Sequence, residues 1–258
     1  MERRNRKTAL VTGAAKGIGR QIAYCMAEAG YHVIVNYHTS REAAEALCRE
    51  MEASFGVETM AVYGDMGKVE DIRRMYEQVF ERFPVVDVLV NNAGISSEVY
   101  FLDATEEMFD EMVAIDWKGV YFSSQIAAKK MIEQGVKGVI INLSSNQVDG
   151  CWPRATIYAP AKAAISKFTK NAAMELSLYG IRMAAIAPGY TDVGWEPGDI
   201  RLKAAERLPF RRFATTTEIA KGVVYLASEE AAYITGTTLV MDGGATLPVV
   251  AANDFVED

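Results

Sequence analysis

Cysteine and histidine are scarce in this chain of 258 residues. The three cysteines, Cys25, Cys48 and Cys151, are widely spaced and form no Cys-x-x-Cys pair, which predicts reduced thiols rather than a disulfide framework. His32 and His38 are the only histidines, so a histidine-rich metal centre is excluded and we expect no metal. Any redox chemistry of this chain therefore requires an organic cofactor.

Long basic runs and long apolar runs are also missing. The net charge is -7, and the one basic cluster is the short opening from Arg3 to Lys7. Nucleic acid and anionic membranes are therefore not expected as partners. Since no apolar run has the length of a signal peptide or of a membrane span, we expect a cytoplasmic protein.

The chain does contain a regular alternation of strand and helix patterns. Its composition, 50% hydrophobic and 24% charged, is that of an ordinary globular protein with a sizeable core. We expect strands over residues 7–12, 31–37, 56–63, 85–91, 137–143, 181–187 and 238–241, and helices over 18–29, 39–53, 69–80, 108–131 and 158–179. In the second helix, Thr39-x-x-Glu42 has the spacing of a capping box. This order predicts one α/β domain over residues 1–258 with a doubly wound, mostly seven-stranded parallel sheet.

Three glycines follow the first strand at the point where the first helix begins. Gly13, Gly17 and Gly19 would let the backbone approach a pyrophosphate, and the helix N-terminus would supply N–H groups and positive dipole. The alternative is a tight turn without a ligand. At the carboxyl end of the third strand, Asp65 could reach an adenine or close a turn.

Ser145, Tyr158 and Lys162 form the candidate catalytic group. Tyr158 and Lys162 lie four residues apart, so a helix would present both on one face, and the cation would favour the phenolate. Ser145 follows the fifth strand and could hold a carbonyl or carbinol oxygen in line for the proton. The combination suits carbonyl reduction or alcohol oxidation, and the alternative for the pair alone is a solvated surface contact.

The regular alternation stops over residues 190–213, which include Trp195 and Pro209. A long irregular excursion within a compact domain is usually functional, so we expect this one to cover the substrate. The alternative is a surface decoration.

These motifs, in this order, resemble the short-chain dehydrogenase/reductase family, whose fold is of the Rossmann type. The resemblance covers nearly the whole chain and is carried by Gly13-x-x-x-Gly17-x-Gly19, Asn91-Asn92-Ala93-Gly94, Ser145, Tyr158-x-x-x-Lys162 and Pro188-Gly189. It implies that Ser145 holds the substrate oxygen, that Tyr158 transfers the proton, and that Lys162 favours the phenolate and binds the nicotinamide ribose. It also implies a homotetramer with an interface on the helices around 112–131 and 156–179.

The resemblance further implies a set of dinucleotide-binding residues. They are Gly13, Lys16, Gly17, Ile18, Gly19, Tyr37, His38, Asp65, Met66, Asn92, Gly94, Tyr158, Lys162, Pro188 and Thr191. Relatives that use NAD usually carry an acidic residue at the end of the second strand, whereas Val35 to Thr39 contains none. Lys16 stands where NADP-binding relatives have a base. We therefore favour NADP(H) as cofactor, with NAD(H) as the alternative.

Within the family, Trp152-Pro153 and Asn36-Tyr37 are most similar to bacterial glucose 1-dehydrogenases, whereas Ser96, Gln147 and Val148 depart from that pattern. Asp116 stands where most members carry the Asn of the catalytic tetrad, which puts the proton relay in doubt. We expect an NADP(H)-dependent oxidoreductase for a secondary alcohol or its carbonyl, preferably a sugar or polyol. The alternatives are a hydroxysteroid, a 3-oxoacyl thioester, and a dinucleotide-binding sensor with weak turnover.

Overall fold

A parallel sheet of seven strands forms the centre of the molecule. The computed structural model describes residues 6–96, 98–196 and 198–247. The strand order is β3-β2-β1-β4-β5-β6-β9, and each neighbouring pair is parallel. The strands are β1 Thr8–Val11, β2 His32–Tyr37, β3 Thr59–Tyr63, β4 Val88–Asn91, β5 Val139–Leu143, β6 Arg182–Pro188 and β9 Thr238–Met241. The doubly wound, seven-stranded fold predicted from the sequence is confirmed.

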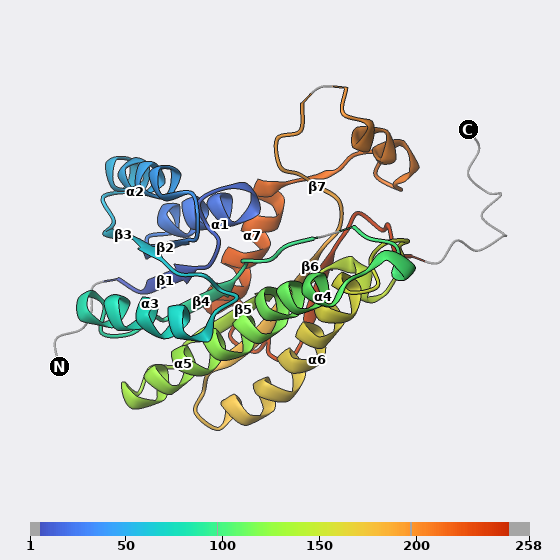
Figure 1. Ribbon diagram of the computed structural model, residues 1–258. Coiled ribbons are helices and arrows are strands. Elements are labelled where there is room, and N and C mark those ends of the chain that lie inside the picture. Colours follow the sequence, from blue (N-terminus) through green and yellow to red (C-terminus); the bar gives the residue numbers. More distant parts are fainter. Residues whose placement is uncertain (1–5, 97, 197, 248–258) are drawn as a thin grey trace.

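Helices cover both faces of the sheet (Figure 1). One face carries α1 (Gly17–Glu28), α2 (Arg41–Phe55) and α7 (Thr216–Ala227). The other carries α3 (Val69–Arg82), α5 (Val120–Glu133) and α6 (Tyr158–Ser177), with α4 (Glu106–Val113) leading into α5 through η2 (Ala114–Gly119). None of the helices over the described ranges combines the length and the apolar character that a membrane crossing needs.

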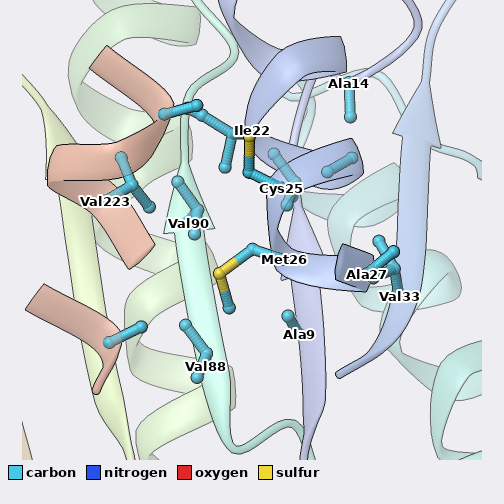
Figure 2. Packing of buried hydrophobic residues seen from close by; sticks show 14 of the residues in the cluster. Ala9, Ala14, Ile22, Cys25, Met26, Ala27, Val33, Val88, Val90 and Val223 are labelled. Carbon is cyan, nitrogen blue, oxygen red and sulfur yellow. The ribbon is translucent and has the colours of Figure 1, made fainter. Parts of the chain in front are cut away.

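Both faces of the sheet are apolar because both are covered. Ala9 and Val11 of β1 point to the side of α1, whereas Leu10 between them points to the side of α3. Figure 2 shows the first of these two cores, where strand residues Ala9, Val33, Val88 and Val90 meet Ile22, Cys25, Met26 and Ala27 of α1 and Val223 of α7. Strands buried on both faces therefore appear in the sequence as short continuous apolar runs.

The predicted capping box at the start of α2 is wrong. The N-cap of α2 is Ser40, whose side chain makes no capping hydrogen bond, so Thr39 and Glu42 are out of register by one residue. A complete capping box occurs at Thr215 and Glu218, which begin α7, a helix that the sequence analysis missed.

The helix predicted over 108–131 is interrupted. Its middle, Ala114–Gly119, is a π-helical segment. A Cβ at Gly119 would collide with the carbonyl oxygen of Met66, so the wider turn and the glycine together bring this helix close to the end of β3. The segment places Asp116 at the site described below.

The excursion over 190–213 contains little regular structure. Two short strands, β7 (Thr191–Asp192) and β8 (Ala214–Thr215), pair in parallel, and the 3-10 segment η4 (Ile200–Arg207) lies between them. In Figure 1 this part projects from the carboxyl end of β6, beyond the edge of the helical layers.

The sheet order creates a crevice at the carboxyl ends of β1 and β4. The chain passes from β1 outward to β2 and β3, then returns to β4 on the other side of β1. Loops that leave such a reversal point in opposite directions leave a crevice between them, and this is where ligands bind in open α/β sheets.

Candidate active site

The turn after β1 has the backbone geometry of a phosphate cradle. Gly13 and Gly17 have φ angles of +61 and +58 degrees, and a Cβ at Gly13 would lie 2.9 Å from Ala93 Cα. A Cβ at Gly19 would collide with the side-chain amide of Asn92. α1 begins at Gly17, and the side chain of its N-cap residue Lys16 makes no capping hydrogen bond. The N–H groups of this helix end therefore suit a pyrophosphate.

Two polar residues that the sequence analysis did not assign to the site hold this turn in place. Asn36 Oδ1 accepts a hydrogen bond from Gly13 N at 3.0 Å, and Asn36 Nδ2 donates to Gly64 O at 3.1 Å. Thr12 Oγ1 accepts from the backbone N of Asn92 and of Ala93, each at 3.0 Å. The turns after β1, β2, β3 and β4 are thus tied to one another below the crevice. The available sequence signal was that Thr12 and Asn36 are polar residues at the ends of apolar strand runs.

Two adjoining cavities occupy the crevice. The first, about 470 Å³, is lined by the dinucleotide-binding candidates Gly13, Lys16, Ile18, Gly19, Tyr37, His38, Asp65, Met66, Asn92 and Gly94. The second, about 340 Å³, is lined by residues that include Ser145, Tyr158, Lys162, Pro188 and Thr191. The two cavities share Ile18, Asn92, Gly94, Ile95, Ser96 and Val193. Of the predicted site residues only Gly17 and Asp116 line neither cavity. Both lie directly behind the wall of the crevice. Gly17 is the first residue of α1, and Asp116 lies beside Gly94.

The candidate catalytic residues come from β5 and α6. Tyr158 is the first residue of α6, and Pro160 is accommodated because the first turn of a helix needs no N–H partner. Lys162 lies one turn later, 4% exposed, with Nζ 5.6 Å from the centre of the Tyr158 ring. Its ammonium donates to Leu143 O at 3.1 Å, at the end of β5. The side-chain geometry brings the phenol and the cation to one cavity, as the sequence spacing predicts.

Ser145 caps the short η3 (Asn146–Val148) after β5. Its Oγ accepts a hydrogen bond from Gln147 N at 3.2 Å. Since this bond uses a lone pair and not the hydroxyl hydrogen, Ser145 can still donate to a substrate oxygen. Ser144 holds the neighbouring helix, because its Oγ donates to Lys162 O at 3.0 Å.

Asp116 is fully buried behind Gly94, which lines both cavities of the crevice. Its Oδ1 accepts from Ile95 N at 2.9 Å, and its Oδ2 lies 4.0 Å from Lys162 Nζ and has no hydrogen-bond partner among the described residues. A Cβ at Gly94 would lie 2.7 Å from Asp116 Oδ1, so this glycine leaves room for the carboxyl group. Burial raises the pKa of Asp116, and the charge of Lys162 and the Ile95 N–H offset only part of that rise.

Asp65 at the end of β3 is a carboxylate with local partners. It accepts from Gly67 N at 2.9 Å and pairs with Lys68 Nζ at 3.1 Å. Burial acts to raise the pKa of Asp65, but these hydrogen bonds and charges outweigh it and lower the pKa overall. Asp65 lines the first cavity and closes its own turn at the same time, so both of the roles predicted for it are compatible with its position.

The mouth of the second cavity carries an ion pair and an aromatic contact that the sequence analysis did not foresee. Arg154 pairs with Glu98 at 2.6 Å, and Arg154 has a φ of +65 degrees, an uncommon conformation for a residue with a side chain. Trp152 Nε1 donates to Tyr190 OH at 3.0 Å, which joins the loop before α6 to the excursion over 190–213.

Comparison with known proteins identifies the relatives of this chain. The family model described as enoyl-(acyl carrier protein) reductase matches residues 13–246. A 3-oxoacyl-[acyl-carrier-protein] reductase of Staphylococcus epidermidis is 39% identical over 92% of this chain and 98% of its own length. An L-rhamnose 1-dehydrogenase (NAD(P)(+)) of Azotobacter vinelandii is 37% identical over 92% of this chain and 96% of its own.

A solved structure extends the likeness to the three-dimensional fold. The crystal structure of a short chain dehydrogenase from Burkholderia cenocepacia in complex with NADP matches with a TM-score of 0.87 and 31% identity. The match covers 93% of this chain and 97% of that one. The glycine turn, the crevice and the two adjoining cavities fit a nicotinamide dinucleotide. This chain therefore belongs to the short-chain dehydrogenase/reductase family, as an oxidoreductase that interconverts CH–OH and carbonyl groups.

Proposed function

We propose that this protein is an NADP(H)-dependent oxidoreductase acting on a secondary alcohol or its carbonyl, with a sugar or polyol as the favoured substrate. The observation that carries the proposal is the meeting of Ser145, Tyr158 and Lys162 in one cavity, which continues into the cavity of the glycine turn. A bound nicotinamide supplies or accepts the hydride there. The remaining chemistry belongs to the protein side chains.

In this proposal, each of the three side chains has a separate task. Ser145 donates a hydrogen bond to the substrate oxygen, since its Oγ already accepts from Gln147 N. Tyr158 gives its phenol proton to that oxygen during reduction and takes it back during oxidation. Lys162 places its ammonium against the Tyr158 ring and is held there by its hydrogen bond to Leu143 O.

Charge at the ribose end supports NADP over NAD. Lys16 lines the first cavity, and the residues at the end of β2 that line it, Tyr37, His38, Thr39 and Ser40, carry no carboxylate. The Asp65 carboxylate is already paired with Lys68. A 2′-phosphate would therefore meet a lysine and no unpaired acid, and the NADP complex of the Burkholderia cenocepacia structure agrees with this preference.

The wall of the second cavity supports a compact, oxygen-rich substrate. Trp152, Tyr190 and Trp195 offer aromatic faces of the kind that stack on sugar rings, beside the polar side chains of Gln147 and Arg154. The excursion over 190–213 would cover the bound substrate, since Tyr190 and Trp195 both contact Phe213 and Tyr190 accepts the Trp152 hydrogen bond. The named activity of the Azotobacter vinelandii relative supports a sugar.

A 3-oxoacyl thioester is the second candidate substrate. The Staphylococcus epidermidis relative is named for that activity, and the segment beyond the cavity mouth exposes Tyr100, Phe101 and Leu102. An acyl chain could lie on this apolar segment. A hydroxysteroid would use the same surface. Activity measured against each substrate class must therefore decide among sugars, thioesters and hydroxysteroids.

Assembly as a homotetramer is a further part of the proposal. The family resemblance places the contact on α5 and α6, and a groove of about 240 Å³ lies between these helices, lined by residues that include Tyr121, Ile132, Phe168 and Tyr179.

Initial rates of nicotinamide absorbance change test the proposed function. NADP and NAD are compared against sugars, polyols, hydroxysteroids and 3-hydroxyacyl thioesters, for the native chain and for Tyr158→Phe. We expect turnover with NADP, and a fall of at least about a hundredfold in Tyr158→Phe while NADPH binding, followed by fluorescence, persists. Full turnover in Tyr158→Phe would contradict the assignment. Cofactor binding without turnover on any class would favour a dinucleotide sensor, for which buried Asp116 would be the residue to explain.

A further inference from the structure

The side chain of Gln147 lies in the wall of the substrate cavity with an unused hydrogen-bonding group. Its backbone N–H donates to Ser145 Oγ at 3.2 Å, so the residue is held next to the atom that would bind the substrate oxygen. Its Oε1 is buried and has no hydrogen-bond partner among the described residues. A buried acceptor without a donor costs free energy that a well-placed ligand can recover.

Several other polar side chains around this cavity already have partners within the protein. Trp152 Nε1 donates to Tyr190 OH, Arg154 pairs with Glu98, and Asn146 Nδ2 donates to Asp242 Oδ2 at 3.4 Å. Asn92 Nδ2 is bound to Thr12 O. Ser145 and Tyr158 are assigned to the reacting oxygen. Within the described part of the wall, Gln147 is the side chain that holds a buried polar atom without a partner, which makes it the candidate for a second polar group of the substrate.

We infer that Gln147 is a specificity-determining residue, which binds a second hydroxyl group of the substrate, on a carbon close to the one that exchanges the hydride. This inference rests on the proposed function and narrows its substrate class to vicinal diols, hydroxyketones and sugars. The Gln147 N–H to Ser145 bond fixes the backbone of Gln147 beside the hydroxyl that would hold the reacting oxygen, and Gln147 lines the same cavity as Ser145.

A hydroxyl group is the partner that suits an amide best. The terminal torsion of a glutamine side chain is soft, so either its carbonyl oxygen or its NH₂ group can turn toward the cavity. A hydroxyl donates and accepts, and it therefore bonds to either side of the amide. A thioester or a ketone oxygen only accepts, and would leave Oε1 unpaired.

Matched substrate pairs test the inference. We would measure kcat/KM with NADP for butane-2,3-diol against butan-2-ol and for glucose against 2-deoxyglucose, in the native protein and in Gln147→Met. The methionine keeps the length of the side chain and removes the amide. We expect the native protein to prefer the member with the second hydroxyl, and the ratio within a pair to fall about tenfold in Gln147→Met, chiefly through KM. Because each ratio is taken on one enzyme sample, partial loss of folded protein cancels.

Two further variants separate a binding role from a structural one. Gln78→Met makes the same exchange on the exposed face of α3 and should keep the native ratio. Gln147→Glu retains acceptor oxygens and should restore most of the preference. An unchanged ratio in Gln147→Met, or the same loss in Gln147→Glu, would overturn the inference while the proposed function stands. Absence of turnover with every pair would instead overturn the proposed function, and the inference with it.

Discussion

Only one of the two carboxyl oxygens of Asp116 has a hydrogen-bond partner among the described residues. Oδ1 is bound to Ile95 N, whereas Oδ2 faces Lys162 at 4.0 Å without a hydrogen bond. The raised pKa of Asp116 means that burial disfavours the ionised form more than Lys162 favours it. Folding therefore disfavours the ionised form of Asp116 relative to the unfolded chain.

This imbalance predicts the effect of Asp116→Asn on stability. A folded-state pKa above the unfolded value gives a stability contribution that is complete below the unfolded pKa and is lost as pH rises through the folded pKa. The amide resembles the neutral acid and does not titrate. At pH 8, Asp116→Asn should therefore have a free energy of unfolding about 1–2 kcal/mol higher than the native chain, measured by urea denaturation. At pH 4.5 this difference should be smaller. A difference that does not change with pH would contradict the assignment of the raised pKa.

At the scale of elements, the capping box of α7 is the best-defined helix start. Thr215 Oγ1 accepts from Glu218 N at 3.1 Å, and Glu218 Oε2 accepts from Thr215 N at 2.8 Å. The helix it begins places Ile219, Val223 and Leu226 in the core against α1. Loss of the cap therefore affects one of the three helices that cover this face of the sheet.

Thr215→Ala should lower the free energy of unfolding by about 1 kcal/mol, because the Glu218 N–H at the start of α7 loses its acceptor, Thr215 Oγ1. Thr39→Ala is the matched control, since Thr39 has the same sequence spacing to an acidic residue but forms no cap in the structure. Urea denaturation of both variants, without cofactor, checks the prediction. Equal losses in the two variants would show that the box at Thr215 contributes nothing specific.

The two boxes also show the limit of prediction from local sequence. Thr39-x-x-Glu42 and Thr215-x-x-Glu218 have the same spacing, and only the second is formed. Which residue becomes the N-cap depends on where tertiary packing sets the start of the helix, and a motif of four residues contains no information on that. The π-helical segment at Asp116 was beyond reach for a similar reason, since the constraint is the contact of Gly119 with Met66, far away in the sequence.

At the scale of the whole molecule, the topology was the most predictable feature. Apolar runs alternating with helical patterns leave few arrangements besides a doubly wound parallel sheet, and the carboxyl ends of its strands bring Gly13, Asn92, Ser145 and Pro188 to one edge. The positions of the motif residues could therefore be predicted from the sequence. The ion pair of Glu98 with Arg154 and the unpartnered Oε1 of Gln147 could not be predicted, because they depend on how separate loops pack above the sheet.

The surface of α5 and α6 supports the last prediction, which concerns assembly. The groove between these helices is lined mostly by apolar side chains, with Lys129 and Glu175 among them, and Ile132 and Tyr179 are 38% and 53% exposed. Apolar helix faces of this kind favour association with a second copy, which would bury them. We therefore expect the native protein to sediment as a tetramer and Ile132→Glu to sediment as smaller species, because association would have to bury the new carboxylate.

Leu102→Glu provides the control for assembly, since Leu102 is 90% exposed but lies on η1 (Phe101–Asp103), away from this groove. It introduces the same charge and should leave the sedimentation coefficient of the native protein unchanged. Sedimentation velocity on the three proteins at equal concentration decides the matter. If Ile132→Glu keeps the native coefficient, the helices α5 and α6 do not form the contact, and the predicted interface is wrong.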